Sequence, residues 1–295
     1  MKLADACFDK LSTVLEKPAR ASYTAANGTF GGAAMGIPRL VLDYGTSSLQ
    51  GISHEEWETR VQLAACYRIF AHLGWTELIY NHITLRVPGP DRHLLINPFG
   101  LHYSEITASN LVKIDLDGNI LSDSRWPINP AGLAPHATVH RHLDKAHCVM
   151  HTHSTAGLAV ACTKGGLSMT NFYSAQLYGK VAYHDFEGIT VNPEEGPRML
   201  KSMGDKPILI LRNHGLLAWG ETLPQAFAHL WTVQRACEIQ VAAKSMGDEL
   251  IEIPKPVLEQ ATRVSLQFDP KYGAGVDVFN ALVRQIDRQD QSYKT

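Results

Sequence analysis

The sequence predicts an α/β protein in which helices surround a largely antiparallel sheet. Short apolar runs bounded by turn residues are typical of strands, and Asp117-Gly118 between two of them is a strong hairpin signal. Helical stretches lie among these runs without the strict strand–helix alternation of a doubly wound fold. The chain has 295 residues, of which 45% are hydrophobic, and this is enough for one large core.

The first half of the chain begins with a segment of weak periodicity. Residues 1–52 include a Gly/Ala/Thr-rich stretch, and we expect an N-terminal extension there. Ser53-His-Glu-Glu56 fits a capping box, and apolar residues at helical spacing then predict a helix over 54–73 that ends before Gly74. The elements expected after it are strands at 78–87, 94–97, 111–115 and 119–121, a short helix at 104–110, and a helix at about 136–143.

The second half continues with strands and helices up to about residue 247. Asn192-Pro-Glu-Glu195 has the N-cap, the proline and the acidic residues that begin a helix, and Thr222-Leu-Pro-Gln225 resembles a capping box that opens a long one. We therefore expect a main domain at 53–247 and a C-terminal extension at 248–295 that makes oligomer contacts. The other expected elements are strands at 148–154, 180–183, 207–211 and 216–219, and helices at 155–162 and about 276–289.

Three histidines have the spacing of a metal site. In the predicted strand Cys148-Val-Met-His-Thr-His-Ser154, His151 and His153 are two residues apart and so project from one face. His214 lies at a tight bend between two apolar runs. Three imidazoles from two strands can hold a metal and leave positions open for water or substrate. The alternative is that they are polar strand residues in a chain with 14 histidines.

Two more histidines share one face of a predicted helix. His136 and His140 are four residues apart, but no glutamate follows His136, so a metalloprotease signature is absent. They could lie at the wall of the same pocket, or pack as ordinary helix residues.

Composition argues against several classes of partner. The formal net charge is −2, only 19% of residues are charged, and no run of Lys or Arg occurs, so nucleic acid and anionic membranes are poor candidates. Five widely spaced cysteines without a Cys-x-x-Cys pair indicate reduced thiols. No apolar run of 18 residues is present. We therefore expect a cytoplasmic protein.

Four motifs, in this order and spacing, resemble the class II aldolase/adducin-head family. The resemblance covers roughly residues 55–244 and implies a three-layer α/β/α sandwich around a mainly antiparallel sheet, assembled as a homotetramer with active sites at subunit interfaces. It also implies that His151, His153 and His214 hold a divalent metal. The motifs are Tyr80-Asn-His-Ile-Thr84, Ile96-Asn-Pro-Phe-Gly100, Val149-Met-His-Thr-His-Ser154 and Leu211-Arg-Asn-His-Gly-Leu216.

The sequence differs from the sugar-phosphate aldolases of this family at the positions that bind phosphate and transfer protons. Their Ser-Ser-Glu run, which supplies phosphate contacts and the acid/base carboxylate, is replaced by Pro130-Ala-Gly132, although His136 matches the His that follows it. Their glycine-rich phosphate loop is replaced by Leu78-Ile-Tyr-Asn81, although Gly100 remains in the second phosphate-contact loop. A phosphorylated sugar is therefore not the expected substrate.

The remaining candidate residues are assigned to proton transfer and substrate binding. Tyr173 matches a tyrosine that the aldolases donate from an adjacent subunit, so we name it the candidate acid beside His136; it could equally be a core or interface aromatic. Arg212 could hold a substrate carboxylate or form a surface ion pair. Asn81 and His82 are expected to line the pocket with Gly100, although His82 could instead be buried and simply hydrogen-bonded.

The predicted activity is a metal-dependent C–C lyase of the decarboxylase or retro-aldol type. A divalent ion on three neutral histidines keeps its full charge and can stabilise an enolate-like intermediate of a non-phosphorylated keto, hydroxy or aromatic carboxylate. Zn²⁺ is the expected metal, with Fe²⁺, Mn²⁺ or Co²⁺ as alternatives. A non-haem Fe(II) oxygenase acting on an aryl keto or hydroxy acid is the second prediction, and a non-catalytic adducin-head-like interaction module is the third.

Overall fold

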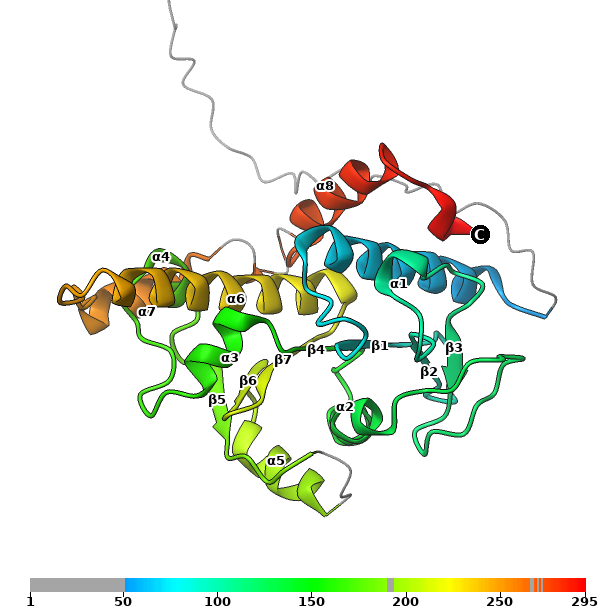
Figure 1. Cartoon of the computed structure of the whole chain (residues 1–295), viewed down its shortest axis with the longest axis horizontal. Helices are drawn as coiled ribbons and strands as arrows, with labels where there is room; N and C mark the ends of the chain where they lie inside the picture. Colours follow the sequence, from blue (N-terminus) through cyan, green and yellow to red (C-terminus); the bar gives the residue numbers. More distant parts are fainter. Residues whose placement is uncertain (1–50, 190–193, 266–267, 270, 272) are drawn as a thin grey trace, which may run out of the picture. The chain divides into compact units, whose positions relative to one another are not determined.

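The computed structural model describes residues 51–295 except 190–193, 266–267, 270 and 272 (Figure 1). The chain divides into two units, Met1–Gly36 and Ile37–Thr295. The first unit, and almost all of the predicted extension at 1–52, lies outside the described residues. All the elements named below belong to the second unit.

A seven-stranded sheet forms the centre of this unit, with the strand order β3-β2-β1-β4-β7-β6-β5. Every neighbouring pair is antiparallel except β5 and β6, which are parallel. The prediction of a mainly antiparallel sheet is therefore confirmed. The strands are β1 (His82–Arg86), β2 (Leu94–Ile96), β3 (Val112–Ile114), β4 (Cys148–Thr152), β5 (Val181–His184), β6 (Ile208–Leu211) and β7 (Gly215–Gly220).

Helices cover both faces of the sheet, which confirms the three-layer α/β/α sandwich. Helices α1 and α6 lie on one face, and α2 and α5 lie on the other (Figure 1). The side chains of Cys148 and Met150 belong to the core on the first face, and that of Val149 belongs to the core on the second. This alternation along β4 is the two-residue period of a strand buried on both sides. The helices are α1 (His54–Leu73), α2 (Pro130–His142), α3 (Thr155–Ala161), α4 (Phe172–Gln176), α5 (Glu195–Met203), α6 (Leu223–Ser245), α7 (Lys255–Arg263) and α8 (Val276–Asp287), with 3₁₀ turns at Tyr103–Glu105 and Ser292–Lys294.

Several predicted elements have different bounds in the structure. The strand expected from residue 78 begins only at His82, because Glu77 and Leu78 have φ angles of 42° and 63° and form a turn. The expected hairpin strand at 119–121 makes a single bridge, from Ile120 to Ile114, and the helix expected at 104–110 is the 3₁₀ turn Tyr103–Glu105.

Helix starts account for most of the other differences. Helix α2 begins at Pro130, six residues before the predicted start, because the Asn129 side chain caps it. Helix α7 has Pro256 in its first turn, where proline is tolerated. The predicted cap at Asn192 lies outside the described residues.

The two predicted capping boxes are each half formed. Ser53 and Thr222 accept hydrogen bonds from the backbone N–H groups of Glu56 and Gln225, as expected. The return bonds are absent among the described residues: the Glu56 carboxylate instead pairs with Arg60 and Lys113. Within the part of the chain that the structure describes, no helix is long and apolar enough to cross a membrane.

Candidate metal centre

His151 lies near the end of β4, the strand at the middle of the sheet. Across the sheet it is in register with His82 of β1 on one side and Leu217 of β7 on the other. His153 follows just beyond the end of β4, and the centroids of the two rings are 4.4 Å apart. The two rings therefore meet in one space, as their spacing predicted.

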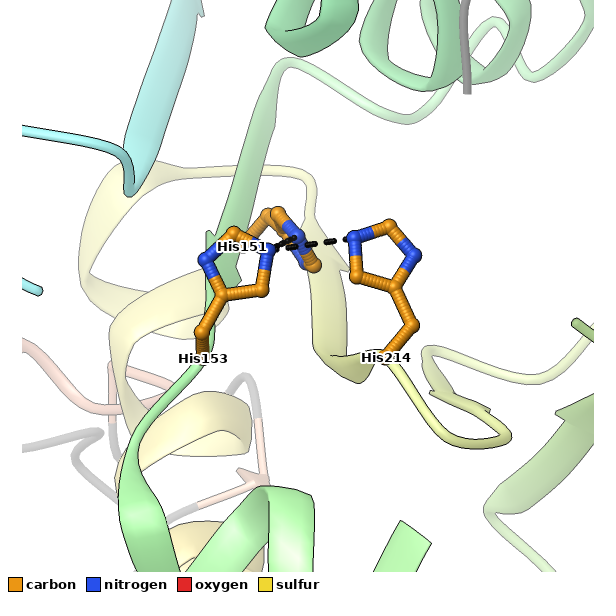
Figure 2. A group of neighbouring side chains, drawn as sticks. All are labelled: His151, His153 and His214. Carbon is orange, nitrogen blue, oxygen red and sulfur yellow. Dashed lines mark hydrogen bonds between the residues drawn. The ribbon is translucent and has the colours of Figure 1, made fainter. Parts of the chain in front are cut away.

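His214 lies in the turn between β6 and β7. The turn is tight because Asn213 takes a left-handed conformation, with φ of 56°, which asparagine tolerates better than most residues. At Gly215, a Cβ would come within 2.4 Å of the Thr152 carbonyl oxygen, so glycine lets β7 approach the end of β4. The turn thereby brings His214 against His151 of β4 and His153 just beyond it (Figure 2).

The three rings direct nitrogen atoms toward one another. His153 Nε2 lies 2.9 Å from His151 Nε2 and 3.1 Å from His214 Nε2 (Figure 2). One ring nitrogen from each residue falls in a group whose members all lie within 4.8 Å of one another. Two nitrogen ligands bound to a common zinc ion at about 2.0–2.1 Å are roughly 3 Å apart, so the two short separations suit such an ion.

Hydrogen bonds at the other ring nitrogens fix the tautomers of His151 and His153. His151 Nδ1 lies 2.9 Å from the Leu216 carbonyl oxygen, and His153 Nδ1 lies 3.0 Å from Asn81 Oδ1. Both oxygens can only accept, so each Nδ1 carries the hydrogen and each Nε2 of a neutral ring carries a lone pair. Two lone pairs that face each other at 2.9 Å are not a hydrogen bond between neutral rings. The donor set therefore fits a divalent cation.

Burial keeps these histidines neutral. Removal from water lowers the pKa of His151 well below its usual value, with repulsion from His82, His153 and His214 adding to the effect. The same desolvation lowers the pKa of His153 and lowers that of His214 to about 4. Neutral imidazoles are the form that binds metals, so no proton has to leave these ligands at neutral pH.

The cluster opens into a cavity of about 910 Å³ with mainly apolar walls. Four large apolar side chains at its edge are mostly exposed: Leu78, Tyr80, Phe186 and Ile189 are 74%, 52%, 52% and 78% accessible. Among the described residues that line this cavity there is no Lys or Arg. The others are Gly74, Thr76, Glu77, His82, Asn129, Ala131, Pro135, His151, His153, Gly188, Asn213 and His214.

Asn81 and His82 are brought to the cluster. Asn81 supports His153, since its Oδ1 accepts both from the His153 backbone N–H at 2.9 Å and from the ring, while its Nδ2 donates to the Trp75 carbonyl. His82 lines the cavity, and its Nδ1 lies 2.8 Å from His136 Nε2. His136 is fully buried behind His82 and does not line the cavity.

The other candidates are not among the residues that line the cavity. Arg212 lies beside Asp185, at 3.4 Å, and its guanidinium is 4.7 Å from the Tyr183 ring centroid, an arrangement that corresponds to the ion-pair alternative. Tyr173 lies on α4 and packs edge-on against Trp231, with the ring centroids 5.4 Å apart. At Gly100 an added Cβ would contact Trp126 at 3.4 Å.

Two residues next to the site had no assigned role in the sequence. Thr84 Oγ1 lies 2.7 Å from His136 Nδ1 and 2.7 Å from His140 Nε2, so it joins these two rings in the core. The signal for Thr84 was its position two residues after His82, on the same face of the strand. The four-residue spacing of His140 from His136 predicted that the two share a helix face, but it did not predict whether His140 contacts the site.

Comparison with known proteins identifies the family. The model of the class II aldolase and adducin N-terminal domain matches residues 61–241. A protein of Pseudomonas aeruginosa that bears an aldolase class 2 name is 45% identical over 245 residues, covering 82% of this chain and 94% of the relative.

A solved structure and an adducin are also similar to this chain. The structure of an aldolase II superfamily protein from Pseudomonas syringae has a TM-score of 0.78 and 42% identity, covering 83% of this chain and 98% of that one. Rat alpha-adducin is 40% identical over 241 residues, which are 77% of this chain and 33% of the adducin. The protein therefore belongs to the class II aldolase and adducin N-terminal domain family.

Proposed function

We propose that this protein is a divalent-metal-dependent C–C lyase that acts on a non-phosphorylated keto, hydroxy or aromatic carboxylate. The observation that carries the proposal is the pair of Nε2 lone pairs of His151 and His153, which converge with His214 at the wall of a cavity. Family membership supports a lyase of the aldolase type.

The three histidines would hold the ion, with Zn²⁺ as the first choice for an all-imidazole donor set. When bound there, a divalent ion acts as a Lewis acid that polarises a carbonyl or hydroxyl oxygen and stabilises negative charge left by C–C cleavage. Asn81 holds His153 in the required orientation through the bond to its Nδ1. The mainly apolar walls would strengthen electrostatic interactions within the cavity.

The lining of the cavity supports a substrate without a phosphate group. A phosphate carries close to two negative charges and is ordinarily held by Arg, Lys or a series of backbone N–H groups. No basic side chain lines this cavity in the described residues, and its rim is apolar. A carboxylate with an apolar or aromatic body suits these walls better than a sugar phosphate.

Assembly into a homotetramer is part of the same proposal. The four exposed apolar side chains at the rim would lie against a second copy or against the substrate, and Tyr173 would reach a cavity from a neighbouring subunit. His136 would act indirectly, because both its ring nitrogens are engaged within the core. Gly100 would help to shape the substrate loop.

The second candidate function is a non-catalytic interaction module. The 40% identity with rat alpha-adducin favours it. The two candidates differ in whether bound metal supports turnover.

Metal analysis of purified protein tests the proposal. We expect about one equivalent of divalent metal per chain, loss of most of it in His151→Ala, and no change in His142→Ala, which removes an exposed histidine of α2. The metal-loaded protein should also release carbonyl product or CO₂ from members of a panel of hydroxy and keto carboxylates under anaerobic conditions. Equal metal content in His151→Ala and wild type would show that the site assignment is wrong. A fully metal-loaded protein without turnover would favour the interaction module.

A further inference from the structure

A fourth histidine faces the cavity without belonging to the three-histidine cluster. The centroid of the His82 ring is 4.9 Å from that of His151, yet the group of ring nitrogens within 4.8 Å of one another contains only His151, His153 and His214. No hydrogen bond within the described part of the chain engages His82 Nε2. Its space depends on Gly132, where a Cβ would lie 2.6 Å from His82 Cδ2 and 3.0 Å from Nε2.

The other nitrogen of His82 begins a buried chain of hydrogen bonds. His82 Nδ1 lies 2.8 Å from His136 Nε2, and His136 Nδ1 lies 2.7 Å from Thr84 Oγ1. Thr84 Oγ1 lies 2.7 Å from His140 Nε2, and His140 Nδ1 lies 2.8 Å from the Ala146 carbonyl oxygen. All four side chains are at most 4% exposed, so these contacts are shielded from bulk water.

The carbonyl at the end of this chain sets the direction of every bond in it. Ala146 O can only accept, so His140 carries its hydrogen on Nδ1 and its Nε2 accepts. Thr84 then donates its single hydroxyl hydrogen to His140 and accepts from His136 Nδ1–H. His136 Nε2 consequently accepts from His82 Nδ1–H. For neutral rings, His82 Nε2 must carry a lone pair.

The surroundings of the chain keep the rings neutral. Burial lowers the pKa of His82 and of His136 well below the usual value and lowers that of His140 to about 3. Arg86 adds to the shift at His140: its guanidinium donates to the His140 carbonyl oxygen, and its positive charge opposes a second charge there.

We propose that His82 Nε2 accepts a hydrogen bond from a hydroxyl group of the small molecule bound at the three-histidine cluster. Thr84, His136 and His140 are positioning residues that hold His82 in the tautomer this contact requires. The inference deepens the proposed function, on which it rests for the choice of a hydroxy carboxylate as ligand. The tautomer itself follows from the hydrogen bonds alone.

The first test measures the tautomer by two-bond ¹H–¹⁵N correlation NMR of the full chain, both metal-free and zinc-loaded. His82 should show a protonated Nδ1 and an unprotonated Nε2. Thr84→Val, which keeps the shape but removes the hydroxyl, should release His82 into a mixture of tautomers, and Thr84→Ser should restore the single form. A protonated Nε2 in the wild type, or a tautomer unchanged by Thr84→Val, would overturn the positioning role.

The second test measures ligand binding by calorimetry on the zinc-loaded protein, with glycolate as the hydroxyl-bearing probe and acetate as its matched control. His82→Phe removes the acceptor but keeps a ring, so glycolate affinity should fall by about threefold to tenfold, the value of one hydrogen bond. Acetate affinity and zinc content should not change. Equal weakening of both probes, or no binding of glycolate to the wild type, would refute the hydroxyl contact.

The two proposals can fail separately. If the chain binds no divalent metal, the proposed lyase function is wrong, whereas the tautomer of His82 is still decided by NMR of the metal-free protein. If zinc binds and turnover occurs while His82 is protonated at Nε2, only the further inference is wrong.

Discussion

The hydroxyl group of Tyr67 joins the first helix to the strand that carries His82. This side chain is fully buried, and its hydroxyl donates to the Ile83 carbonyl oxygen at 2.6 Å. It also accepts from the backbone N–H groups of Ile83, at 3.0 Å, and Asn97, at 3.2 Å. In Tyr67→Phe, these two donors would be left without their partner at the start of β1 and the end of β2.

The expected cost follows from the groups left unpaired. A buried donor that loses its partner costs roughly 1–3 kcal/mol, so two of them predict a loss of about 2–6 kcal/mol in the free energy of unfolding. The matched control is Tyr103→Phe. Tyr103 is equally buried and packs edge-on against Tyr67, with ring centroids 4.7 Å apart, but its hydroxyl has no hydrogen-bond partner among the described residues.

Removing the Tyr103 hydroxyl should be neutral or stabilise by up to about 2 kcal/mol, because a buried polar group without a partner is itself unfavourable. Urea unfolding followed by circular dichroism gives both values. If the two variants lose stability to within about 0.5 kcal/mol of each other, a figure typical of an ordinary surface substitution, the hydrogen-bond argument is wrong.

Three further predictions follow from other buried groups. His229 is buried and its pKa is lowered to about 4, so between pH 6.5 and 4 the unfolded chain binds a proton that the folded chain does not. The free energy of unfolding should therefore fall by up to roughly 1.4 kcal/mol per pH unit as the pH drops through this window. His229→Gln should reduce the slope of unfolding free energy against pH by that amount. Gly132→Ala should lower the free energy of unfolding by about 1–3 kcal/mol and shift the NMR resonances of the His82 ring, because the added Cβ would contact that ring. Gly165→Ala, where the added Cβ would enter open space, should change neither. Arg60 pairs with Glu56 at 3.0 Å and is 2% exposed, so Arg60→Met should lower the free energy of unfolding in urea by about 3–5 kcal/mol. Lys145→Met, at the exposed pair with Glu221, should lower it by less than about 1 kcal/mol. Similar losses in both variants would contradict the role of burial.

The sequence was sufficient where the pattern is local and periodic. The two-residue spacing of His151 and His153 predicted that their rings meet in one space, and a tight bend was expected at His214. Helix α1 agrees with the prediction because its apolar period, its cap at Ser53 and its terminal Gly74 all specify the same element. Family motifs predicted the sandwich and the mainly antiparallel sheet, which one hairpin signal alone would not have established.

Only the tertiary structure decided how side chains from distant elements meet. Thr84 and His140 are 56 positions apart in the sequence, yet their side chains contact each other beside the site. No local sequence period predicts such a contact. Arg212 lies beside Asp185 and Tyr183, because a half-buried guanidinium pairs with the groups that the fold places next to it. The tautomer of His82 was likewise undetermined in the sequence, since it follows from a chain of contacts that ends with His140 on α2 and the Ala146 carbonyl oxygen.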